Sequence, residues 1–268
     1  MPVKIASWNV NSLNVRLPHV IEWLDAEKPD ILALQETKLP DDRFPADHFS
    51  ELGYEVLYSG QKTYNGVAIL ARTHYEIRNP LTDIPGLDDP QRRILAADIG
   101  NLRILNLYVV NGQEVGSDKF AYKMHWLDKV TDYVRSDVGV YDYYVILGDF
   151  NIAPADEDVH DPDMWRDKIL CSVQERSALE NIKSLGFKDT FRLFEQPDNS
   201  FSWWDYRAAG FRRNLGLRID LLLANTALAK RCTRAWIDRT PRGWDRPSDH
   251  APVIGEFDLD NAMDVQAR

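Results

Sequence analysis

The chain has 268 residues, of which 44% are hydrophobic and 28% are charged. This composition is that of a globular protein with a sizeable core, and it excludes a disordered chain. The formal net charge of −10 argues against a strong nucleic-acid binder, unless carboxylates gather around a metal and basic residues cluster on one face. The basic candidates for such a face are Arg92, Arg93, Lys119, Lys123, Arg207, Arg212, Arg213 and Arg218.

No apolar run approaches the roughly 18 residues that a membrane helix needs, and the N-terminal segment lacks the pattern of a signal peptide. The two cysteines, Cys171 and Cys232, are far apart and belong to no CxxC motif, so we interpret them as reduced thiols. These features predict a cytoplasmic protein without a membrane partner.

Short apolar or β-branched runs recur from end to end, and their lengths are typical of strands. Several are apolar almost throughout, as in strands that are buried on both faces. The runs are Lys4–Trp8, Ile31–Gln35, Glu55–Tyr58, Val67–Ala71, Ile94–Ile99, Arg103–Val109, Tyr143–Leu147, Ile219–Ala224 and Val253–Phe257.

Helical spacing of apolar residues appears in three places, Pro18–Lys28, Lys119–Val134 and Val173–Leu185. Ser172, with Glu175 three residues later, reads as a capping box at the start of the third helix. Many strands with few helices predict packed sheets with helices outside. No break in composition marks a boundary, so we expect one domain over residues 1–268.

Polar side chains collect where the predicted strands end. Asn9 and Asn11 follow the first strand, Glu36 follows the second, and Asp149 and Asn151 lie in a Gly-Asp-x-Asn turn. Each group alone has a simple interpretation as a turn. Together they could converge on one cleft and offer the oxygen ligands that Mg²⁺ prefers.

Two further acidic positions are harder to explain as turns. Asp220 lies inside an otherwise apolar strand, where a carboxylate is costly unless it is paired or bound to a metal. Asp249 directly precedes His250 and could hold an imidazolium against a phosphate. The chain has no zinc-type His/Cys cluster, no GxSxG motif and no glycine-rich phosphate loop, which disfavours a zinc enzyme, a serine hydrolase and a P-loop nucleotidase.

With these residues in view, the chain resembles the exonuclease III family of bacterial apurinic/apyrimidinic endonucleases, within the endonuclease/exonuclease/phosphatase superfamily. The resemblance spans nearly the whole chain, and its ordered set of motifs is specific. The matching segments are SWNVNSL, ALQETK, GVAIL, QRRI, LGDFNIAP, FSWWDYR, LRIDLLLA and PSDHAPV.

The resemblance implies an α/β fold, a four-layer sandwich of two mixed sheets packed face to face with helices outside. It implies dependence on Mg²⁺, for which Mn²⁺ can substitute. The implied activities on double-stranded DNA are incision 5′ to abasic sites, 3′→5′ degradation, and removal of 3′-phosphates and other 3′ blocks. A monomer is the default expectation.

The resemblance also assigns roles to the residues that match its motifs. Glu36 is the main metal ligand, assisted by Asn9, Asn11 and Asp249. The catalytic set comprises Asp149, which activates water, and the groups that contact the phosphate or orient the histidine, namely Tyr108, Asn151, Asp220, Asp249 and His250. Substrate contacts fall to a pocket for the flipped abasic sugar and to backbone-binding cations, namely Trp203, Leu217, Ile219, Arg92, Arg93 and Lys119.

One loop departs from the family in a way that bears on specificity. The segment after Asn151 is acidic, with Asp156, Glu157 and Asp158, and it carries His160. An acidic or bulky loop beside the cleft would restrict the DNA substrates that the cleft can bind. We therefore expect a shifted balance among the three activities.

Two other interpretations remain open. A hydrolase of the same superfamily that acts on a phosphoinositide, sphingomyelin or a nucleotide would keep Glu36, Asp149 and His250 but would lack Trp203 and the QRRI segment. An inactive relative that only binds nucleic acid or protein would have lost part of the catalytic set, which is complete in this chain.

Overall fold

The structure, a computed structural model, describes residues 2–259. Its centre is two six-stranded mixed sheets. Sheet A has the order β13-β14-β1-β2-β4-β3. Its strands are β1 (Val3–Asn9), β2 (Ile31–Gln35), β3 (Tyr54–Ser59), β4 (Val67–Arg72), β13 (Cys232–Ile237) and β14 (Val253–Phe257).

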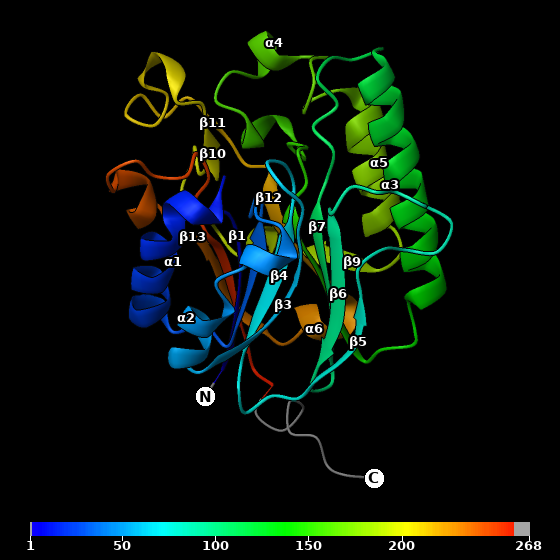
Figure 1. Cartoon of the computed structure of the whole chain (residues 1–268). Coiled ribbons are helices and arrows are strands. Elements are labelled where there is room, and N and C mark those ends of the chain that lie inside the picture. The colour runs from blue at the N-terminus through cyan, green and yellow to red at the C-terminus, as the bar shows by residue number, and fades with distance from the viewer. Residues whose placement is uncertain (1, 260–268) are drawn as a thin grey trace.

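Sheet B has the order β5-β6-β7-β8-β12-β9. Its strands are β5 (Ile77–Leu81), β6 (Ile94–Ile99), β7 (Leu102–Tyr108), β8 (Tyr143–Asp149), β9 (Phe187–Asp189) and β12 (Asp220–Asn225). A separate two-stranded ribbon joins β10 (Trp203–Trp204) to β11 (Gly216–Leu217). This ribbon lies at the upper end of the sandwich in Figure 1.

Helices cover the outer face of each sheet and complete four layers (Figure 1). On sheet A, α1 (Leu13–Glu27) and α2 (Ala46–Glu51) pack through Val20, Trp23 and Phe49. On sheet B, α3 (Asp118–Asp137) and α5 (Val173–Lys183) pack through a second apolar cluster that includes Trp126 and Leu179. The short helices are α4 (Pro162–Trp165) and α6 (Thr226–Ala229). The predicted four-layer α/β sandwich is confirmed.

Each sheet contains one parallel pair, and the two pairs end at the same end of the sandwich. β1 pairs with β2 so that Asn9 faces Gln35, and β7 pairs with β8 so that Tyr108 faces Asp149. The antiparallel partner β12 brings Asp220 to the same register position as Asp149. Polar side chains that are distant in sequence therefore meet at one edge.

The faces that the two sheets turn toward each other are apolar for most of their length and become polar at this edge. Side chains alternate between the two faces of a strand. On the inter-sheet face, β1 reads Val3, Ile5, Ser7, Asn9; β2 reads Ile31, Ala33, Gln35; β7 reads Leu102, Ile104, Asn106, Tyr108; and β8 reads Val145, Leu147, Asp149. The apolar core between the sheets is therefore continuous with the polar edge.

The nine predicted strands and three predicted helices are all present, with shifts at their ends. The first helix begins at Leu13 rather than at Pro18, so Pro18 lies inside it. Ser172 caps α5 as expected, because its hydroxyl accepts a hydrogen bond from the amide of Glu175. The short edge strands β5, β9 and β13 were not predicted. The expected single domain over 1–268 stays a prediction, and residues 1 and 260–268 lie outside the described range.

Two expected surface cations are in fact buried. Lys123 and Arg218 are 0% and 1% exposed. The ammonium of Lys123 pairs with Glu175 at 2.5 Å and donates to the carbonyl oxygens of Asn151 and Asn111 at 2.7 and 3.2 Å. Both residues are therefore structural, because carboxylates and carbonyls surround their charges, and neither belongs to a nucleic-acid surface.

Within residues 2–259, no helix has the length and apolar character required to cross a membrane.

We expect Lys123→Met to destabilise the fold by about 3–5 kcal/mol, because it leaves the buried Glu175 carboxylate unpaired. Urea unfolding followed by circular dichroism measures this change. Arg135→Ala is the control, since its pair with Asp132 is 57% and 66% exposed, and its loss should change stability by less than about 1 kcal/mol. Equal effects of the two substitutions would contradict the expectation.

Candidate active site

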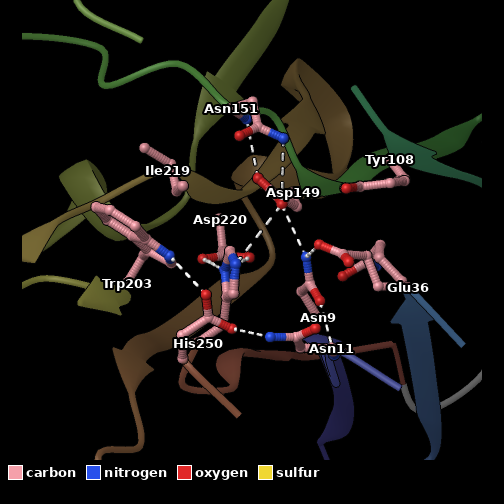
Figure 2. Close-up of polar contacts among 12 residues, drawn as sticks. Asn9, Asn11, Glu36, Tyr108, Asp149, Asn151, Trp203, Ile219, Asp220 and His250 are labelled. Carbon is pink, nitrogen blue, oxygen red and sulfur yellow. Dashed lines mark hydrogen bonds and ion pairs between the residues drawn. The ribbon is translucent and has the colours of Figure 1, made fainter. Parts of the chain in front are cut away.

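The polar edge of the sandwich holds a compact cluster of side chains from six segments (Figure 2). They come from the ends of β1, β2, β7 and β8, from the start of β12, and from the loop before β14. The predicted catalytic and metal-binding residues are all in or beside this cluster, namely Asn9, Asn11, Glu36, Tyr108, Asp149, Asn151, Asp220, Asp249 and His250.

Asn9 links the two sheets at this edge. Its side-chain nitrogen donates to Glu36 Oε1 and to Asp149 Oδ2, both at 2.9 Å. Its oxygen accepts the backbone amide of Asn11 at 2.9 Å and so holds the turn after β1. Glu36 adopts a left-handed backbone conformation with φ 51°, which turns the chain away from β2 at that point. Asn9 therefore fixes the separation of the Glu36 and Asp149 carboxylates.

Lys38 neutralises Glu36 from the solvent side. Its ammonium lies 2.8 Å from Glu36 Oε2 and donates to Asn11 Oδ1 at 2.6 Å. Burial alone would raise the pKa of Glu36, but the charge of Lys38, the hydrogen bonds from Lys38 and Asn9 and the charge of His250 together outweigh it, and the pKa is lowered. Glu36 is therefore ionised at neutral pH. Sequence reasoning missed Lys38, although it directly follows the ALQET segment.

Asp149 is fully enclosed by donors. Asn151 reaches it twice, through its backbone amide to Oδ1 at 2.9 Å and through its side chain to Oδ2 at 3.3 Å. The left-handed φ of 49° at Asn151 bends the turn back and makes this double contact possible. The side chain of Asn151 also accepts a hydrogen bond from Asn111 at 3.1 Å, a further residue that the sequence did not reveal.

His250 lies between the two buried aspartates. Its Nδ1 is 2.9 Å from Asp220 Oδ2, and its Nε2 is 3.8 Å from Asp149 Oδ2. Ser202, also missed from sequence, donates to Asp220 at 2.6 Å. The hydrogen-bond partner of the imidazole is Asp220 rather than the expected Asp249, whose charge nevertheless contributes to the raised pKa of His250. Adjacent residues of an extended chain point in opposite directions, and Asp249 instead accepts from Asn11 at 2.9 Å and Trp203 at 3.0 Å.

The charges at the site support one another. Burial raises the pKa of Asp149, and the charge of Asp220 adds to the rise, although His250 opposes it. Burial alone would lower the pKa of His250, but the charges of Asp220 and Asp149 raise it above its usual value. The imidazole is therefore held protonated, with Nε2 directed toward Asp149.

The site also fits a divalent cation. Glu36, Asp149 and His250 each offer one ligand atom, and these atoms lie within 4.8 Å of one another. Hard cations such as Mg²⁺ take carboxylate oxygens and retain several water ligands, so the two carboxylates suffice. The expected ligand Asp249 is outside this group of three, and its two oxygens accept hydrogen bonds from Asn11 and Trp203.

Tyr108 projects over Glu36 and Asp149 from the end of β7 (Figure 2). Burial raises the pKa of its phenol well above the usual value, and the charges of Glu36 and Asp149 raise it further. The guanidinium of Arg93 lies 4.6 Å from the centre of the Tyr108 ring. The phenol is therefore a neutral hydrogen-bond donor at neutral pH.

A small apolar cluster adjoins the charged cluster. Trp203 faces Leu217 across the β10–β11 ribbon, and both pack with Ile219 in one small cluster beside Ala153 and Val159. Trp203 and Ile219 lie on the His250 side of the cluster in Figure 2. The structure therefore brings together the three residues that were predicted to line a sugar pocket.

A hollow of about 790 Å³ lies on the other side of the cluster. Arg93, Lys119 and Asn111 are among its lining residues, together with the 67% exposed Tyr64. Arg92 does not line it, and its backbone amide instead bonds Gln61 at 2.8 Å. Two of the three predicted backbone-binding cations thus share one surface.

The acidic loop after Asn151 does not turn its carboxylates toward the cluster. Asp156, Glu157 and Asp158 pair with Arg176, Arg192 and Arg218, at 2.8, 3.2 and 2.6 Å respectively. His160 packs against the strand that carries Leu217, with Nδ1 3.1 Å from the carbonyl oxygen of Gly216. Any effect of this loop on specificity therefore rests on the bulk of His160.

Comparison with known proteins agrees with this geometry. The chain matches the model of the endonuclease/exonuclease/phosphatase family over residues 6–250. It is 36% identical to exodeoxyribonuclease III of Haemophilus influenzae over 95% of this chain and 100% of that protein.

Solved structures give the same result. A 3′ phosphatase from Neisseria, bound to a product DNA hairpin, has a TM-score of 0.93 at 47% identity and covers 96% of this chain and 99% of its own. An AP endonuclease from Archaeoglobus fulgidus has a TM-score of 0.91 at 37% identity, with 96% and 99% coverage. This chain belongs to the endonuclease/exonuclease/phosphatase family.

Proposed function

We propose that the protein is a metal-dependent phosphodiesterase of DNA repair. It incises DNA 5′ to abasic sites, degrades duplex DNA from 3′ ends, and removes 3′-phosphates and other 3′ blocking groups. The observation that carries this proposal is the cluster of Glu36, Asp149, Asp220 and His250 beside the apolar cluster at Trp203. Relatives named exodeoxyribonuclease III, 3′ phosphatase and AP endonuclease support it.

The chemistry follows from the charges. Hydrolysis of a phosphodiester needs an aligned water and neutralisation of the negative charge that develops on the phosphate. Asp149, with its raised pKa and its position fixed by Asn9 and Asn151, orients the water and accepts its proton. The imidazolium of His250, held by Asp220, donates to a phosphate oxygen. Neutral Tyr108 and the Asn151 amide are further donors.

We propose Mg²⁺, replaceable by Mn²⁺, as the cofactor. Glu36 would be its main protein ligand, with Asn9, Asn11 and Asp249 assisting through the hydrogen bonds around it, and Asp149 would remain the base for the attacking water. When bound, the ion supplies a Lewis acid that stabilises charge on the attacked phosphate and the leaving oxygen. Protonated His250 is left free for the phosphate.

Two parts of the surface serve the recognition of DNA. The apolar cluster of Trp203, Leu217 and Ile219 is the contact for a flipped sugar without a base. Arg93 and Lys119, which line the hollow, suit the phosphates of the neighbouring strand, and Arg92 remains a proposed contact outside the hollow. We further propose a single-domain monomer acting in the cytoplasm, where its two free thiols would stay reduced.

We expect cleavage of a synthetic abasic duplex in Mg²⁺, and we expect EDTA to abolish it. Asp149→Asn should lower the rate by several orders of magnitude, because an amide cannot accept the proton of water. Asp163→Asn, on the exposed side of α4, is the matched control. Cleavage of phosphoinositide or sphingomyelin, but not of DNA, in the same assay would overturn the proposal.

Lys119→Ala should weaken DNA binding equally for all sequences. The slope of log K against log salt should fall in magnitude by about one, because one phosphate contact is lost. Fluorescence anisotropy between low and moderate salt measures this slope. Lys188→Ala, in the edge strand β9, is the control, and an unchanged slope for Lys119→Ala would remove Lys119 from the interface.

His160→Gly should raise the rate of abasic incision relative to 3′-phosphate removal. An internal abasic site needs DNA on both sides of the cleft, whereas a 3′ end needs room on one side only, so a smaller side chain beside Leu217 favours the former. Rates on matched duplexes give the ratio. His74→Gly, in an exposed turn, is the control, and an unaltered ratio in His160→Gly would show that this loop does not set the balance.

A further inference from the structure

A hydrogen-bonded bridge of side chains crosses the space between the two sheets. Asn106 of β7 donates to the carbonyl oxygens of Leu34 in β2 and Ala68 in β4, at 3.0 and 2.9 Å. Its oxygen accepts a hydrogen bond from Gln35 Nε2 at 2.8 Å, and Gln35 Nε2 also donates to Ser7 Oγ at 2.9 Å. The bridge thus connects one strand of sheet B to three strands of sheet A.

The bridge is buried among apolar side chains, where an apolar contact would cost less free energy of folding than these polar groups do. Ser7, Gln35 and Asn106 are all 0% exposed, and their neighbours toward the sandwich interior on the same faces are Ile5, Ala33 and Ile104. Gln35 Oε1 has no hydrogen-bond partner among the described residues. Burying an unpaired carbonyl opposes folding. The sequence therefore retains a core that is less stable than an apolar one would be at this position. Proteins accept such a loss of stability at functional positions.

The position of the bridge suggests its purpose. Gln35 directly precedes Glu36, and Asn106 lies two residues before Tyr108 on the same face of β7. Tyr108 is in turn paired in register with Asp149. The bridge therefore forms the layer directly beneath the reacting groups, where the half of the site that sheet A supplies meets the half that sheet B supplies.

We infer that Asn106 and Gln35 are positioning residues that set the placement of Glu36 relative to Tyr108 and Asp149. Apolar packing between sheets is non-directional and permits one sheet to slide over the other. Hydrogen bonds to fixed backbone carbonyls have preferred distances and angles, so they resist this sliding. Because Glu36 and Asp149 come from different sheets, their separation depends on the register that the bridge maintains.

This inference rests on the proposed function for its catalytic consequence, but the metal site offers a separate measurement. Groups that orient metal ligands typically change metal affinity or activity by about 10–100-fold when they are replaced. The double variant Asn106→Leu/Gln35→Leu should therefore bind Mn²⁺ at least tenfold more weakly in calorimetry of the protein alone. In the DNA assay, kcat should fall by a similar factor, while KM stays within about twofold.

The double variant removes the Gln35–Asn106 pair together, but the carbonyl oxygens of Leu34 and Ala68 and the hydroxyl of Ser7 each lose a donor, so the thermal unfolding midpoint should fall. Mn²⁺ affinity and kcat are therefore compared per folded molecule: a positioning role lowers both, whereas a merely structural role lowers the midpoint and leaves both unchanged. If the double variant does not fold, Gln35→Met alone is measured, since it retains the bonds of Asn106 to Leu34 and Ala68.

Thr131→Val is the matched control, because it removes a buried hydrogen bond to Leu127 within α3, outside the space between the sheets. Wild-type Mn²⁺ affinity in both bridge variants would overturn the inference, as would an affinity loss equal to that of Thr131→Val. A wild-type protein that binds Mn²⁺ but cleaves no DNA would instead overturn the proposed function, and the comparison of Mn²⁺ affinities would still decide on the bridge.

Discussion

His250 lies against two buried carboxylates, and the rest of the site depends on this contact. Asp149 and Asp220 occupy paired positions on β8 and β12, so the charge of Asp220 adds to the rise that burial causes in the pKa of Asp149. The imidazole between them, at 2.9 Å from Asp220 and 3.8 Å from Asp149, lets both remain acceptors. The carboxylates in turn keep the imidazole protonated. The carboxylates and the imidazole therefore depend on each other for the charge states that the reaction needs.

The two sheets give this cluster its rigidity because the site is a continuation of the core. On the inter-sheet faces, apolar side chains give way first to the amides of Gln35 and Asn106 and then to the carboxylates of Glu36 and Asp149. Strand alternation repeats every two residues, so a shift of one residue in any strand would turn its polar group to the outer face. The register that packs the core therefore also aims the reacting groups.

Sequence patterns predicted the parts of the molecule that depend on local periodicity. Apolar runs located the central strands, and the residues that follow them, such as Glu36 and Asp149, were found because polar groups at strand ends can converge on one cleft. Partners that depend on tertiary register were not predictable. Adjacency in sequence predicted Asp249 as the charge partner of His250, whereas the imidazole contacts Asp220. Lys123 had the helical position of a surface cation, and only the approach of α5 shows why it is buried.

The same register explains how a chain with a net charge of −10 can accommodate a polyanion. Four of its carboxylates, Glu36, Asp149, Asp220 and Asp249, lie at the proposed cleavage site, where Lys38, His250 and a divalent ion would offset them. Other acids near the cleft, at Asp156–Asp158, are bound to arginines. The net charge includes all of these carboxylates as negative charges. A phosphate that approaches the cleft, however, experiences a weaker repulsion, because the paired cations largely cancel the electrostatic field of the carboxylates. Unpaired cations at the surface, such as Lys119, can then set the sign of the remaining attraction.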